Sequence, residues 1–151
     1  MAGAEFRVRT KKKIARIDVT KEVERAAKEL GAKSGALGLT QLLPGTAKPL
    51  VKSVLRVRYR RAFLYDPGVN ARLGAAFFRQ LLDRFGGNAR YALAGYNGGP
   101  ARMQRVLAEN HGRSEDEILE SHPLWETRDY VRRVLLYAES YRELYPPPPA
   151  P

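Results

Sequence analysis

One segment near the middle of the chain constrains the fold more than any other. Between Asp66-Pro67 and Gly86-Gly87, apolar residues recur at the spacing of one face of an α-helix. Proline is favoured at the first position of a helix and glycine just after its last, so the helix is expected to lie between these two pairs. Its apolar face comprises Val69, Leu73, Phe77, Leu81 and Phe85.

The sequence also predicts a series of helices over most of the remaining chain. Asn88 can cap one helix, Pro100 can begin the next, and Ser114 with Glu117 has the spacing of a capping box. Helices are expected over 20–30, 39–43, 88–95, 100–107, 114–120 and 126–144, whereas residues 47–65 form a basic amphipathic stretch of uncertain type. The aromatic residues of the last helix, expected in the core and at its rim, are Tyr130, Tyr137, Tyr141 and Tyr145. The pattern predicts an all-α protein.

The composition narrows the possible chemistry. The 151 residues contain no cysteine and only two histidines, which nearly excludes thiolate metal sites, zinc centres and a Ser-His-Asp triad. Lys+Arg 27 against Asp+Glu 16 gives a net charge of +11, which is compatible with nucleic acid, an anionic membrane surface or acidic cell-wall polymer as partner. No apolar run approaches the roughly 18 residues of a membrane span, so no span is expected.

The chain is expected to form one helical domain over residues 18–145, with a basic arm over 1–17 and a proline-rich tail over 146–151. The arm lacks the apolar core of a secretory signal. Within it, the alternation over residues 6–9 is compatible with a short strand.

Two short segments have compositions that packing alone does not explain. In residues 34–41, small residues would let a ligand approach the backbone, and Gln41 can both donate and accept hydrogen bonds. In residues 94–100, Tyr96 and Asn97 precede paired glycines, and an aromatic ring beside an amide suits sugar binding. An equally weighted interpretation is a helix end at Asn97-Gly98 with Tyr96 in the core.

Taken together, these segments resemble the soluble lytic transglycosylases and the related goose-type lysozyme fold. That family has a GAxGLMQLMPxTA stretch, then an AYNAGP turn, then an ETRxYV stretch that opens a late helix. This chain has GALGLTQLLPGTA at 35–47, Asp66-Pro67 with Asn70 and Leu73-Gly74, RFGGN at 84–88, GYNGGP at 95–100 and ETRDYV at 126–131. The matching order over most of the chain is more specific than any single motif.

The resemblance implies a lysozyme-like helical fold and cleavage of the peptidoglycan bond between N-acetylmuramic acid and N-acetylglucosamine. Such enzymes use one glutamate, first as acid and then as base, and release 1,6-anhydro products without metal or organic cofactor. By motif position, the residues expected at the saccharide are Gln41, Tyr96, Asn97, Glu126 and Tyr130. A monomer that acts on glycan strands in the periplasm or cell wall is implied, with no nucleic-acid partner.

The family's catalytic glutamate has no obvious counterpart. It belongs to an ESxFxP stretch about a dozen residues before GAxG, and counting back from Gly35 reaches Val23, flanked by Glu22 and Glu24. Glu29 is the candidate if the intervening loop is shortened, whereas Glu22 and Glu24 lie among cations that would lower a carboxyl pKa. A third interpretation is that the chain has lost the catalytic helix, and with it the glutamate, and is an inactive glycan-binding or structural relative. A basic helical nucleic-acid-binding protein is a further alternative, although it leaves the two loop segments without a role.

Overall fold

The computed structural model describes residues 6–9, 14–17 and 35–146. The expected helix over 20–30, the three candidate glutamates at 22, 24 and 29, and all but the first residue of the proline-rich tail lie outside these residues. The chain divides into two compact units, Met1–Phe77 and Phe78–Pro151, and the boundary falls within helix α3, Pro67–Arg84.

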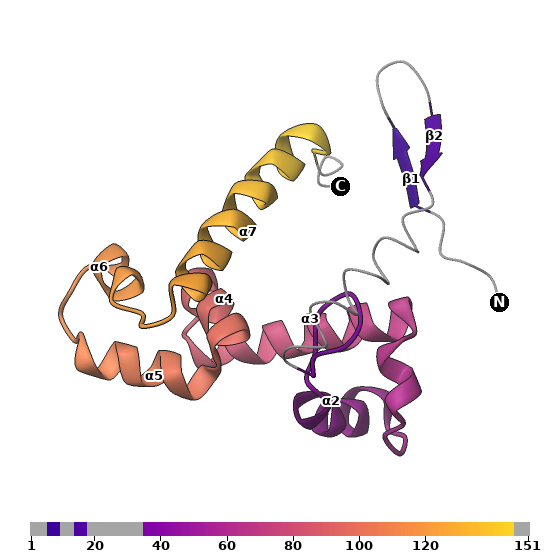
Figure 1. The fold of residues 1–151 in the computed structure, drawn as a ribbon, viewed down its shortest axis with the longest axis horizontal. Coiled ribbons are helices and arrows are strands. Elements are labelled where there is room, and N and C mark those ends of the chain that lie inside the picture. Colours follow the sequence, from indigo (N-terminus) through magenta and orange to yellow (C-terminus); the bar gives the residue numbers. More distant parts are fainter. Residues whose placement is uncertain (1–5, 10–13, 18–34, 147–151) are drawn as a thin grey trace, which may run out of the picture. The chain divides into compact units, whose positions relative to one another are not determined.

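The first unit combines a small sheet with short helical segments (Figure 1). Strands β1, Phe6–Arg9, and β2, Ile14–Ile17, pair antiparallel. The strand over 6–9 is confirmed, but its partner was not anticipated, because the sequence IARI does not alternate apolar and polar residues. The other elements before α3 are α2, Pro44–Leu50, the π-helical turn η1, Val51–Leu55, and the 3₁₀ turn η2, Arg61–Leu64.

The helix expected over 39–43 is wrong. Residues 37–42 form a tight turn closed by a bridge between Leu37 and Leu42, and α2 begins only at Pro44. Both Gly38 (φ 76°) and Gln41 (φ 51°) adopt left-handed backbone conformations, which a right-handed helix cannot contain. Pro44 starts the helix instead of ending one, because its fixed φ suits the first helical position.

The second unit is built from the end of α3 and four further helices: α4, Ala89–Gly98, α5, Pro100–Glu109, α6, Glu115–Glu120, and α7, Trp125–Leu144. Helix α4 packs against both α5 and α7. The expected caps are present: the Asn88 side chain accepts a hydrogen bond from the Tyr91 N–H, and Ser114 with Glu117 forms the capping box. The all-α class is confirmed, because β1 and β2 are the only strands among the described residues.

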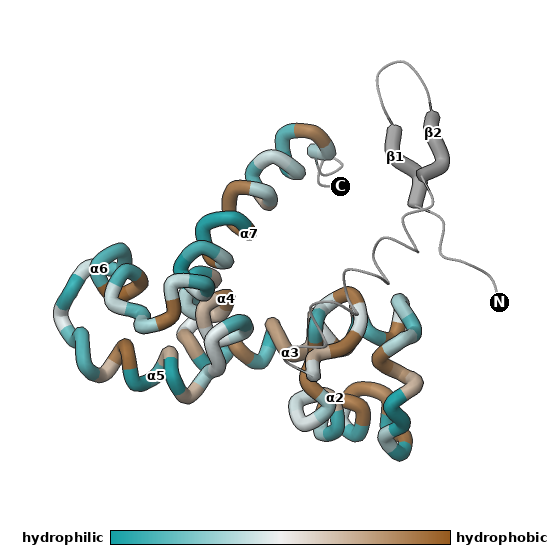
Figure 2. The backbone as a smooth tube through the Cα atoms, viewed as in Figure 1, coloured by the Kyte–Doolittle hydropathy of each residue, from teal (hydrophilic) through white to brown (hydrophobic). Residues whose placement is uncertain are grey.

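The expected core position of the α7 aromatic residues is wrong for most of them. The buried residues of α7, Thr127 and Val131, lie in its first two turns, whereas Tyr141 is 64% exposed. Ten-residue α4 spans about 15 Å and twenty-residue α7 about 30 Å, so α4 covers only part of its partner. Polar and apolar segments alternate along α7 in Figure 2.

In the part of the chain that the structure describes, no helix combines the length and apolar character that crossing a membrane requires.

Candidate functional site

The turn that carries Gln41 is held in shape by its own backbone. Leu37 and Leu42 exchange two backbone hydrogen bonds, at 2.9 and 3.1 Å. The Gln41 side-chain nitrogen donates to the Gly38 carbonyl at 2.8 Å, so the amide lies back along the turn. Its oxygen has no hydrogen bond to a described residue, and the side chain is half-buried. Gln41 therefore keeps an acceptor for a ligand.

Asn70 of α3 attaches this turn to the rest of the first unit. Its side-chain oxygen accepts from the Thr40 N–H at 2.8 Å and from the Thr40 hydroxyl at 2.7 Å. Its side-chain nitrogen donates to the Leu37 and Leu64 carbonyls at 3.1 and 3.0 Å. A Cβ at Gly38 would lie 2.1 Å from that nitrogen, so only glycine fits there. Asn70, fully buried, thus fixes the Gln41 turn.

The second cluster lies where α4 ends and α7 begins. The helix break expected between Tyr96 and Pro100 occurs at Gly99 (φ 93°), so Asn97 lies in the last turn of α4 and is exposed. The buried Thr127 hydroxyl donates to the Asn97 side-chain oxygen at 2.7 Å. This hydrogen bond fixes the orientation of the amide and leaves its nitrogen, which donates to no described residue, for a ligand.

The buried side chain of His122 packs against the end of α4 at this junction. A Cβ at Gly98 would lie 2.9 Å from the His122 ring and 2.9 Å from the Thr127 hydroxyl, so α4 approaches both closely. The His122 Nδ1 accepts from the Leu124 N–H at 3.3 Å, and its buried Nε2 has no hydrogen-bond partner among the described residues.

The electrostatic surroundings of His122 favour its neutral form. Burial lowers the pKa of His122, and the positive charges of Arg102 and Arg128 lower it further, while the Leu124 backbone hydrogen bond opposes both. Arg128 also donates to the His122 carbonyl at 3.0 Å, which holds the loop before α7 against the helix.

The remaining predicted residues of this cluster differ in exposure. Tyr96 is half-buried and packs edge-on against Phe78, with ring centroids 6.5 Å apart. Tyr130 is also half-buried, and burial raises the pKa of its hydroxyl. Glu126 lies exposed in the first turn of α7, next to Thr127.

The structure thus places four of the six predicted site residues, Tyr96, Asn97, Glu126 and Tyr130, on two helices that pack together. Gln41 belongs to the other unit, and Glu29 lies outside the described residues.

Asn70 and Thr127 belong to segments that carry the family resemblance, but no sequence pattern predicts that they or His122 support the site. Thr127 could have been found, because it lies inside the quoted ETRDYV segment, whereas nothing local marks the pairing of Asn70 with a turn thirty residues away.

Among the described residues, no group of three or more acidic or histidine side chains is arranged to hold a metal ion.

The helical fold, with a glutamine in a tight turn and an asparagine at a helix junction, places the chain in the class of lysozyme-like helical domains. The chain belongs to the Transglycosylase SLT domain family, whose model matches residues 20–119. Those residues include the three candidate glutamates and exclude Glu126 and Tyr130.

Curated relatives agree with this assignment. The chain is 39% identical over 110 residues to the soluble lytic murein transglycosylase of Salmonella typhimurium and 38% identical over 110 residues to that of Escherichia coli. In both cases the match covers 72% of this chain but 17% of the relative, so the chain spans less than a fifth of their length.

Solved structures show the same likeness. The lytic transglycosylase Slt of Pseudomonas aeruginosa, in the form of an inactive mutant, superposes with a TM-score of 0.65 at 34% identity over 82% of this chain and 21% of that one. A complex of the 70 kDa soluble lytic transglycosylase with bulgecin A superposes with a TM-score of 0.67 at 28% identity, covering 87% of this chain and 25% of that one.

Proposed function

We propose that this protein is a peptidoglycan lytic transglycosylase that cleaves the β-1,4 bond between N-acetylmuramic acid and N-acetylglucosamine. The observation that carries the proposal is the Asn97 amide, oriented by buried Thr127 and exposed at the α4–α7 junction of a family member. A fixed amide with a free N–H suits a sugar hydroxyl or acetamido oxygen. We also propose that the protein acts in the periplasm or cell wall, where this polymer lies, and that it acts as a monomer.

The proposed reaction needs one carboxyl group. The glutamic acid gives its proton to the glycosidic oxygen while the bond from C1 of the muramic acid breaks, and the acetamido carbonyl of the same sugar stabilises the cation. The resulting carboxylate takes the proton of the muramic 6-hydroxyl as that oxygen bonds to C1. The product is a 1,6-anhydro end, water is not consumed, and neither a metal nor an organic cofactor is required.

Glu29 is the proposed acid, since a shortened loop would bring it to the place of the family's glutamate. Gln41, Tyr96 and Asn97 would contact sugars, and Glu126 and Tyr130 would contact the saccharide or support those contacts. The half-buried Gln41 and Tyr96 side chains fit this role, because each can present a polar atom or a ring while staying fixed.

The second candidate is a glycan-binding relative without catalysis. It is favoured by one specific observation, the absence of a Glu-Ser pair anywhere before Gly35. In this case the Asn97 cluster would bind glycan strands and no bond would be cleaved.

Mass spectrometry of the soluble products from purified peptidoglycan tests both candidates. Muropeptides with 1,6-anhydromuramic ends are expected from the wild-type protein and from the Glu22→Gln and Glu24→Gln controls, but not from Glu29→Gln. Reducing ends would contradict the transglycosylase reaction. No products at all, from folded protein that pellets with sacculi, would support the binding relative.

A further inference from the structure

The excess positive charge of this protein is confined to one of its two units. Residues 78–151 contain ten lysines and arginines and ten aspartates and glutamates, so the second unit has no net charge. Residues 1–77 contain 17 and 6, which accounts for the whole excess of +11. A general need for solubility would not require this division, so the charge of the first unit indicates a surface that binds an anion.

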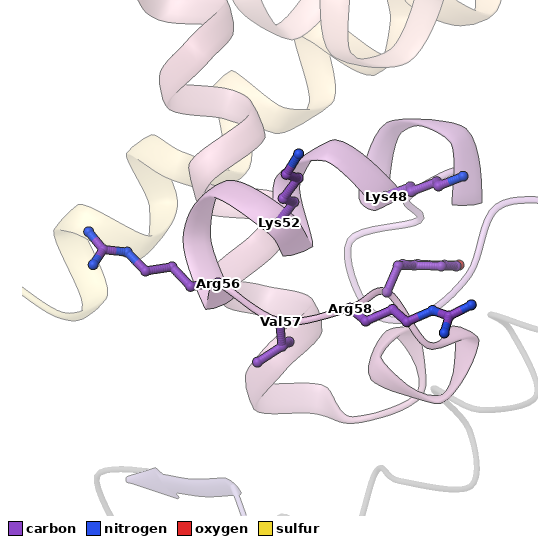
Figure 3. Close-up of a pocket in the computed structure, with 6 residues that line it drawn as sticks. Lys48, Lys52, Arg56, Val57 and Arg58 are labelled. Atoms are coloured by element: carbon purple, nitrogen blue, oxygen red, sulfur yellow. The ribbon is translucent and has the colours of Figure 1, made fainter.

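Such a surface lies along α2, η1 and the segment that follows. Residues 44–65 contain six cations and no carboxylate. An open groove of about 720 Å³ is lined there by Lys48, Lys52, Arg56, Val57, Arg58 and Tyr59 (Figure 3). In this view Lys48 and Arg58 extend towards one side and Arg56 towards the other, so the charges are spread along the surface and do not converge on one point.

The backbone of this segment exposes its cations. Pro49 lies in the last turn of α2, the chain continues as the π-helical turn η1, and Arg56 ends that turn in a left-handed conformation, φ 57°. The side chains of Lys52, Arg56 and Arg58 in and after this turn are exposed.

None of these cations is neutralised within the described residues. The ion pairs there all belong to the second unit and join Arg79 to Asp83, Arg90 to Glu115 and Asp116, Arg132 to Glu120, and Arg133 to Asp129. Within the described part of the chain, no carboxylate therefore competes with an external anion for the groove cations.

We propose that this groove binds a phosphodiester polymer whose backbone carries one charge per repeating unit. Spread, unpaired cations in a groove much larger than one phosphate match an extended chain of regularly spaced charges, and binding would release the counterions of that chain. Lysine offers a point charge, and the planar arginine group can contact two phosphate oxygens at once.

The groove has few side chains that could recognise the bases of a nucleic acid. Tyr59 is its one aromatic lining residue, and it is half-buried with a buried hydroxyl group. Binding of single-stranded nucleic acid normally uses several exposed rings on which successive bases stack. The geometry therefore favours a polymer without bases, such as a poly(polyol phosphate), over nucleic acid.

Fluorescence anisotropy of the full chain with labelled poly(glycerol phosphate) tests this inference. The groove variant is Lys52→Gln/Arg56→Gln/Arg58→Gln, and the matched control, Arg84→Gln/Arg105→Gln/Arg142→Gln, removes the same charge from exposed positions of the second unit. The groove variant is expected to bind at least about tenfold more weakly at about 50 mM salt, and its slope of log affinity against log salt should fall by about 2. The control should lose less than about threefold.

Equal losses of affinity in both triple variants would overturn the inference. So would poly-glutamate of equal charge that binds as tightly as poly(glycerol phosphate). Single-stranded DNA that binds more than about tenfold more tightly than poly(glycerol phosphate) would also overturn it. Single variants Lys52→Gln and Arg58→Gln provide the same test if the triple variant unfolds, each lowering the slope by about 0.7. Because the assay contains no peptidoglycan, its result is independent of the proposed cleavage.

Discussion

At the scale of single residues, Asn70 determines whether the Gln41 turn keeps its shape. Asn70→Ala would remove four side-chain hydrogen bonds and take this donor from the Leu64 carbonyl, whereas the Leu37 carbonyl would still accept from the Leu42 N–H. Because unsatisfied buried polar groups are costly, we expect the free energy of unfolding to fall by about 2–4 kcal/mol, measured by urea denaturation.

Asn110→Ala is the matched control for Asn70→Ala. The Asn110 side chain makes one described hydrogen bond, to the Val106 carbonyl at 2.9 Å, at a half-buried position. Its loss should cost about 1 kcal/mol. Equal costs at the two positions would contradict a special role for Asn70.

His122 should make stability depend on pH. Its pKa in the folded protein is lowered, mainly by burial, so as pH falls below about 6.5 the unfolded chain binds a proton that the folded chain does not. This contribution to stability is complete above that pH and is lost towards acid. We expect His122→Leu to show a smaller decrease in unfolding free energy between about pH 8 and pH 5 than the wild type, measured by urea denaturation. His111→Gln, at an exposed position, is the matched control, and an equal change in both variants would contradict burial of His122 as the cause.

At the scale of elements, the connection between α4 and α5 depends on one glycine. Gly99 has φ 93°, and a Cβ added there would meet no atom within 4 Å, so Gly99→Ala would be opposed by backbone strain and not by a clash. We expect a loss of about 1–3 kcal/mol in thermal unfolding, together with weaker sacculus binding, because Asn97 lies two residues before the strained position.

Gly45→Ala is the matched substitution for Gly99→Ala. Gly45 lies inside α2, also has open space around an added Cβ, and has no left-handed φ. Alanine favours helix there, so a gain of up to about 1 kcal/mol is expected. A loss at both glycines would show that something other than backbone conformation is responsible.

Local patterns predicted those elements whose determinants are local. Helix α3 follows from its apolar spacing between Pro67 and Gly86-Gly87, and the Ser114 capping box is readable from four residues. The turn over 37–42 was mistaken for a helix because its decisive contact, Asn70 to Thr40, spans thirty residues. The exposure of Tyr141 was missed because it depends on how far a neighbouring helix extends.

The candidate site also combines features that the sequence predicted with features that only the fold supplies. Motif order made Asn97 a candidate for sugar binding, whereas its fixed orientation comes from Thr127 on another helix. The family resemblance could indicate which residues meet a saccharide, whereas the supports of those residues required the arrangement of α4 and α7.

At the scale of the whole molecule, the two proposed kinds of contact with a cell wall belong to different units of the chain. The first unit carries all of the excess charge, and its groove cations would attract phosphate-bearing polymer through forces that salt weakens. The second unit has no net charge, and its Asn97 cluster would bind sugar through hydrogen bonds, which salt screens far less.

Co-sedimentation with purified sacculi that retain poly(polyol phosphate), over a range of salt concentrations, separates these contributions. The groove variant should pellet less than the wild type at about 50 mM salt and equally at about 500 mM, since the charged contribution is screened by then. Asn97→Ala should instead weaken pelleting at both concentrations, because its contact is uncharged. Combining the two sets of substitutions should give losses that add, as expected for sites without shared partners. If Asn97→Ala affected pelleting at low salt only, or if duplex DNA bound with the same salt resistance as sacculi, the division of the molecule into a charged and a sugar-binding unit would be wrong.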